Sequence, residues 1–115
     1  MAKRILVIED DNALATLYRS ALCMAGCDVN VAGDGITALE DIDEDHPDLV
    51  VLDLHLPQLT GETILSEVAA TPETRDIPVI VVTGTDASPV ARVTAVLRKP
   101  CDPGDLVALV QQHLN

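Results

Sequence analysis

Short aliphatic runs recur along the chain and predict its strands. Three of them, at residues 5–8, 49–52 and 77–82, consist almost entirely of Val, Leu and Ile. A continuous apolar run of this length is typical of a strand that is buried on both faces. Two less regular segments, at residues 28–32 and 95–97, bring the number of predicted strands to five.

Between these strands, apolar residues recur at intervals of three and four, which predicts amphipathic helices. The predicted helices are residues 12–25, 36–45, 61–70 and 102–114, with a further short helix opening at Ser88 and Pro89. The apolar face of the first helix includes Leu17, and that of the second begins at Ile36. Asp11 and Asn12 are both candidate N-caps of the first helix, and Gly26 is a candidate stop signal.

Strands that alternate with helices predict a parallel sheet with helices on both of its faces. In open sheets of this kind, ligands bind outside the carboxyl ends of the strands. Polar residues stand at four of these ends: Glu9 with Asp10, then Asp53, Thr83 and Lys99. We therefore expect these five side chains to share one crevice.

Three of these residues are carboxylates, which repel one another unless a cation neutralises them. Oxygen ligands with room for water suit Mg²⁺. Lys99 adds a positive charge, and the hydroxyl of Thr83 leaves space for an anion beside the metal. A carboxylate nucleophile, a divalent cation, a lysine and a hydroxyl are together the groups needed for phosphoryl transfer to an aspartate.

Composition narrows the function classes further. The 115-residue chain has 19 acidic and 7 basic residues, a formal net charge of −12, which argues against direct binding of nucleic acid or anionic membranes. No apolar run is long enough to span a membrane. Three cysteines favour a reducing, cytoplasmic compartment. Cys23 and Cys27 are four residues apart and could bind a metal as a pair. We favour the interpretation that both are small apolar residues that fill space in the core.

The chain resembles the receiver domain of two-component response regulators over essentially its whole length. The matching motifs are ILVIEDD at 5–11, DLVVLDLHLP at 48–57, Gly61, PVIVVTG at 78–84 and Lys99-Pro100. The resemblance implies a single α/β receiver domain over residues 1–115. Its implied fold is a flavodoxin-like (βα)5 three-layer sandwich, with a five-stranded parallel sheet in the order 2-1-3-4-5.

The resemblance also implies a signalling switch rather than an enzyme acting on a separate substrate. Asp53 would accept a phosphoryl group from a histidine kinase or a histidine-phosphotransfer protein. Asp10 and Asp53 would bind Mg²⁺ directly together with the backbone carbonyl of His55, and Glu9 would act through a metal-bound water.

The remaining implied roles concern the phosphoryl group itself. Thr83 would hydrogen-bond this group, and Lys99 would pair with it. The peptide bond between Lys99 and Pro100 would be cis. The downstream protein partner is not implied by the resemblance.

The chain departs from the family pattern where the signal is read out. Thr83 and Lys99 are only 16 positions apart, fewer than is typical. Val96 stands where many receivers carry an aromatic switch residue, and Cys101 stands where a Phe often follows the Lys-Pro pair. The pocket chemistry is complete, whereas the readout is expected to be altered.

These departures keep a second hypothesis open, a protein-binding module that uses the receiver fold without phosphorylation. A phosphatase with an aspartate nucleophile is disfavoured, because such enzymes typically carry a second acid where this chain has His55. The imidazole of His55, two residues after the acceptor, is a candidate influence on hydrolysis of the acyl phosphate.

Overall fold

The computed structural model describes residues 2–84 and 93–114. Five parallel strands form one sheet in the order β2-β1-β3-β4-β5, as the resemblance implies. The strands are β1 (Arg4–Ile8), β2 (Asp28–Ala32), β3 (Leu49–Asp53), β4 (Val79–Thr83) and β5 (Ala95–Arg98). The helices are α1 (Asn12–Met24), α2 (Gly35–Asp45), α3 (Gly61–Ala70) and α4 (Pro103–His113).

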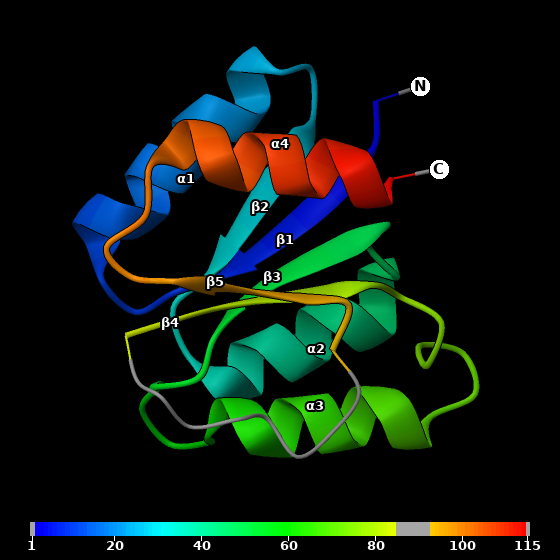
Figure 1. The fold of residues 1–115 in the computed structure, drawn as a ribbon. Coiled ribbons are helices and arrows are strands. Elements are labelled where there is room, and N and C mark those ends of the chain that lie inside the picture. The colour runs from blue at the N-terminus through cyan, green and yellow to red at the C-terminus, as the bar shows by residue number, and fades with distance from the viewer. Residues whose placement is uncertain (1, 85–92, 115) are drawn as a thin grey trace.

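The sheet separates two apolar cores, which produces a three-layer sandwich (Figure 1). Alternate residues of the strands point to opposite faces. Leu6 and Ile8 of β1 pack with α2 and α3, whereas Ile5 and Val7 pack with α1 and α4. Both faces of β3 and β4 are therefore buried, as their continuous aliphatic runs predict.

The strand register brings the polar strand ends together. Ile8 is aligned with Leu52, and Leu52 with Val81. Thr83 is aligned with Arg98, the residue before Lys99. Since all the strands are parallel, the residues that follow them emerge at the same edge of the sheet.

Local capping explains where α1 begins and ends. Asp11, not Asn12, is the N-cap: its Oδ1 accepts the N–H of Leu14 at 3.1 Å, and Asn12 is the first helical residue. At the other end Gly26 adopts a positive φ of 94° and donates to the carbonyl of Cys23. This Schellman-type end confirms Gly26 as the stop signal.

Three details of the pattern-based prediction were wrong. Leu17 and Ile36 are each 47% exposed, because α1 buries the narrower stripe of Ala15, Tyr18 and Leu22, and α2 packs through Ala38 and Ile42. The fourth strand begins at Val79 rather than at residue 77, because the N–H of residue 77 is used in a turn with the carbonyl of residue 74.

The short helix predicted to open at Ser88 and Pro89 lies outside the described residues. Among the helices that are described, none is long and apolar enough to cross a membrane.

Candidate functional site

The predicted site residues gather at the carboxyl edge of the sheet. Glu9 follows β1, Asp53 ends β3, Thr83 ends β4 and Lys99 follows β5. Glu9, Asp53 and Thr83 are buried, with exposures of 2%, 6% and 1%, whereas Asp10 is exposed. The structure therefore combines buried polar groups with one carboxylate that faces solvent.

Lys99 links the two buried carboxylates. Its Nζ lies 2.7 Å from Oε1 of Glu9 and 3.2 Å from Oδ2 of Asp53. Its backbone N–H donates to the carbonyl oxygen of Thr83 at 2.8 Å, which fixes the start of the segment after β5 against β4. The peptide bond from Lys99 to Pro100 is cis, as expected. The sequence predicts Lys99 as a charge partner of the carboxylates, and the structure adds that its shortest contact is with Glu9.

Backbone N–H groups hold the other carboxylate oxygens. The N–H of Asp11 donates to Oε2 of Glu9 at 3.2 Å, and that of His55 donates to Oδ1 of Asp53 at 3.0 Å. These bonds orient the two carboxylates. The expected role of the His55 carbonyl as a metal ligand stays a prediction.

Gly61 brings the start of α3 against the chain that follows Asp53. Its N–H donates to the carbonyl of Leu54 at 3.0 Å. A Cβ atom at this position would lie 2.5 Å from Cα of Leu54 and 3.0 Å from the carbonyl oxygen of Asp53. Only glycine permits so close an approach, so this contact positions the backbone of the buried aspartate.

Three carboxylates form a group that fits a divalent cation. One oxygen each from Glu9, Asp10 and Asp53 lies within 4.8 Å of the other two. The donor set is entirely oxygen, and a single lysine charge faces three acidic ones, so a hard cation such as Mg²⁺ suits it. Asp10, which is exposed, leaves one side open to the water that Mg²⁺ usually retains.

Burial sets the electrostatics of this group. Burial raises the pKa of Glu9 to about 7; the hydrogen bond from Lys99 lowers it in part, and Asp53 raises it further. Burial alone would lower the pKa of Lys99, but its hydrogen bond to Glu9 and its proximity to Asp53 leave that pKa raised. The lysine therefore stays protonated at neutral pH.

The raised pKa of Glu9 predicts a pH-dependent stability for the metal-free protein. Because this pKa rises from an ordinary 4.5 to about 7, the folded state holds the proton more tightly than the unfolded state. The stabilisation from this proton is fully present below pH 4.5 and is lost as the pH rises through 7. We expect its loss to lower the free energy of unfolding by about 2 to 3 kcal/mol over that window.

Urea denaturation with a chelator present, at several pH values from 4.5 to 7.5, measures this effect. Glu9→Gln is the matched variant, because its amide cannot titrate in this range. The difference between the two proteins isolates Glu9 from the other acidic groups. Parallel pH profiles for the two proteins would contradict the prediction.

The cysteines do not form a second metal site in the part of the chain that the structure describes. There, the one group of three or more possible ligands is Glu9, Asp10 and Asp53. Cys23 is exposed, so the prediction that it fills space in the core is wrong. Cys27 is partly buried against the core between the sheet, α1 and α4.

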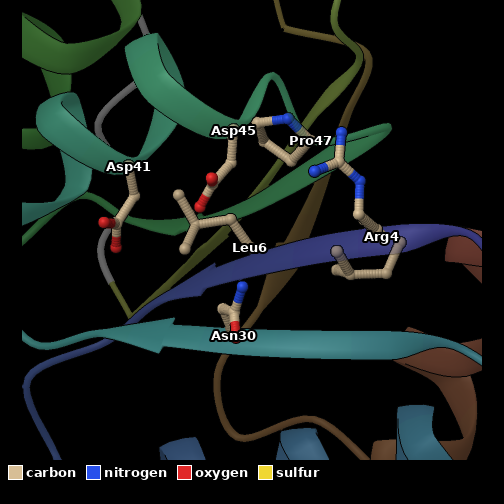
Figure 2. A pocket seen from close by; sticks show the side chains of 7 residues that line it. Arg4, Leu6, Asn30, Asp41, Asp45 and Pro47 are labelled. Atoms are coloured by element: carbon tan, nitrogen blue, oxygen red, sulfur yellow. The ribbon is translucent and has the colours of Figure 1, made fainter.

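A separate small cavity lies between α2 and the first two strands (Figure 2), and the carboxylates of the site do not line it. Its volume is about 10 Å³, room for about one water molecule. The guanidinium of Arg4 donates to the carbonyl of His46, and the N–H of Arg4 donates to Asp48. Asp41 also lines the cavity, and its pKa is raised by burial and by Asp45. These contacts tie the end of α2 to β1.

Comparison with known proteins agrees with this arrangement. Residues 5–111 match the response regulator receiver domain family. The response regulator MprA of Mycobacterium ulcerans (strain Agy99) is 39% identical over 87 residues, which cover 76% of this chain and 37% of that protein. MprA of Mycobacterium avium (strain 104) is 38% identical over 84 residues, covering 73% of this chain and 36% of that protein. The chain thus spans little more than a third of these relatives.

Solved structures share the fold over almost the whole chain. A CheY-like response regulator receiver domain protein from Methanospirillum hungatei JF-1 has a TM-score of 0.90 at 26% identity, covering 97% of this chain and 93% of its own. The receiver domain of a sensor histidine kinase from Pseudomonas aeruginosa PAO1 has a TM-score of 0.91 at 25% identity, covering 98% of both chains. That protein is described with a magnesium ion coordinated in its active site cleft.

The family match extends over nearly the full sequence and includes all four strand ends that carry the candidate site. The fold, with its 2-1-3-4-5 strand order, agrees with the solved receivers. The chain therefore belongs to the response regulator receiver domain family.

Proposed function

We propose that this chain is the phosphoacceptor of a two-component phosphorelay, with Asp53 as the residue that is phosphorylated. The observation that carries this proposal is the position of Asp53: it is buried beside Lys99 at 3.2 Å and grouped with Glu9 and Asp10. A buried carboxylate that contacts a cationic side chain and belongs to a set of hard-metal ligands suits an acyl phosphate.

In the transfer step, a carboxylate oxygen of Asp53 forms a bond to phosphorus, and the P–N bond of the donor phosphohistidine breaks. The electron pair of that bond returns to the imidazole of the donor. The ammonium of Lys99 gives up part of its contact with Asp53 and pairs with the incoming phosphoryl oxygens. The Thr83 hydroxyl donates a hydrogen bond to the same oxygens.

Asp10 and Asp53 would hold Mg²⁺ directly, with the carbonyl of His55 as a further ligand, and Glu9 would act through a metal-bound water. The bound ion would neutralise negative charge on the phosphoryl oxygens. The Pseudomonas receiver described with magnesium supports this assignment.

The donor is a histidine kinase or a histidine-phosphotransfer protein, and phosphorylation switches a surface that binds a downstream protein. We infer that residues 1–115 act as one receiver domain in the cytoplasm. The chain does not contact nucleic acid directly, because its net charge of −12 opposes binding to phosphate backbones. It is a signalling switch, which takes part in its own phosphorylation and dephosphorylation.

Intact-mass spectrometry after incubation with acetyl phosphate and Mg²⁺ tests this function. The wild type is expected to gain the mass of one phosphoryl group, and Asp53→Asn none, because the amide is not a nucleophile. Asp48→Asn, an exposed acid outside the site, is the matched control and should be phosphorylated normally. A chelator should abolish the gain.

Phosphorylation of Asp53→Asn would contradict the assignment of the acceptor. A wild type that gains no phosphate would instead favour the binding module that works without phosphorylation. Such a module would bind its partner equally well with and without beryllofluoride.

A further inference from the structure

Tyr18 is the one aromatic residue in the sequence, and it is buried on α1 with 2% exposure. Its hydroxyl lies 3.6 Å from Sγ of Cys101, within hydrogen-bond distance for sulfur. Burial is the main cause that raises the pKa of Tyr18, and the contact with Cys101 raises it further. The hydroxyl therefore keeps its proton at neutral pH. A buried phenol requires such a partner, and the thiol supplies it.

Cys101 belongs to the segment that carries the site lysine, since it stands two residues after Lys99. The start of this segment is held by the bond from the N–H of Lys99 to the carbonyl of Thr83. Its next part is held by Tyr18, so residues 99–101 are fixed from β4 at one end and from α1 at the other. In Figure 1, α1 and α4 cover the same face of the sheet, and this segment leads from β5 into α4.

The start of α1 is itself attached to the site. Its N-cap, Asp11, donates its N–H to Oε2 of Glu9, and Oε1 of Glu9 accepts from Lys99 at 2.7 Å. The contacts thus form a closed ring that runs from Lys99 to Glu9, along α1 to Tyr18, and through Cys101 back to Lys99.

The geometry points to Tyr18 as a positioning residue that acts through Cys101 to hold the Lys99 ammonium against Glu9 and Asp53. This inference rests on the proposed phosphoacceptor function. Tyr18 itself does not enter the reaction. It approaches from α1 the segment in which Cys101 replaces the Phe found in many receivers, so the aromatic ring in this region comes from a different element.

Two variants test the inference. Tyr18→Phe keeps the ring and removes the hydroxyl, and Cys101→Ala removes the thiol. In the metal-free protein, each is expected to shift the NMR signal of the Lys99 side-chain ammonium. With Mg²⁺ and saturating acetyl phosphate, each variant is expected to be phosphorylated about fivefold more slowly than the wild type. This factor corresponds to the loss of one ordinary hydrogen bond. The half-saturating acetyl phosphate concentration should stay unchanged, and the double variant should match the single ones.

Val110→Ala is the matched control, because Val110 is buried in the same core on α4. It should lower stability while leaving the Lys99 signal and the rate per folded molecule unchanged. A Tyr18→Phe protein with the wild-type Lys99 signal and rate would overturn the inference. A wild type that takes up no phosphate, together with a shifted Lys99 signal in Tyr18→Phe, would overturn the proposed function and support the positioning role.

Discussion

Replacing Lys99 with alanine is expected to destabilise the metal-free protein by about 3 kcal/mol at pH 8. The change removes the cation that lies 2.7 Å from Glu9 and 3.2 Å from Asp53. Two buried carboxylates then face each other without a counter-charge, and leaving a buried charge unpaired costs more than the pair itself contributes. Chemical denaturation in the presence of a chelator measures the loss.

The same substitution is expected to tighten Mg²⁺ binding by about tenfold, because the ammonium and the metal compete for the same carboxylates. Calorimetric titration with Mg²⁺ measures the change. Lys99→Met separates loss of charge from loss of the side-chain stem and should behave like the alanine variant. Lys3→Ala removes an exposed lysine and should change neither quantity. A Lys99→Ala protein with wild-type stability and weaker Mg²⁺ binding would show that Lys99 does not neutralise these acids.

The position of the site could be predicted from the sequence because it depends on topology alone. Once residues 5–8 and 49–52 are recognised as buried parallel strands, the acids after them must lie at one edge of the sheet. The same reasoning places Thr83 and Lys99 there. No knowledge of loop conformation is needed for this step, and in the structure these residues do lie at the carboxyl ends of their strands.

The contacts within the site could not be predicted in the same way, because they depend on side-chain direction and on loops. The pairing of Lys99 with Glu9 in particular depends on the direction of the lysine side chain, which no periodicity encodes. The approach of Tyr18 to Cys101 joins residues 83 positions apart and follows from how α1 lies on the sheet.

The exposure of Leu17 and Ile36 has a related cause. Helical spacing identifies a broad apolar stripe, but the sheet covers only the part of it that faces the core. In α2, the small residues Gly35 and Ala38 allow close contact with the rest of the fold, so Ile36 is left at the margin. Periodicity alone cannot tell a small residue at the centre of an interface from a large one at its edge.

Gly61→Ala is expected to destabilise the protein by about 3 kcal/mol, although alanine is the better helix former. The added Cβ would lie 2.5 Å from Cα of Leu54, 2.8 Å from its Cδ2 and 3.0 Å from the carbonyl oxygen of Asp53. Two of these three atoms belong to the backbone, so a change of rotamer cannot relieve the overlap. The start of α3 must move away from the chain that follows Asp53.

That movement should also reach the chemistry, because the chain that Gly61 contacts at Asp53 and Leu54 is the one held by the hydrogen bond from His55 N–H to Asp53 Oδ1. We expect the folded fraction of Gly61→Ala to be phosphorylated more slowly than the wild type, as measured by intact mass over time. Gly33→Ala is the matched control: nothing lies within 4 Å of its added Cβ, so its stability should stay within about 0.5 kcal/mol of the wild type. Equal stability of the two variants would mean that Leu54 yields without cost, and Gly61 would then have no part in positioning Asp53.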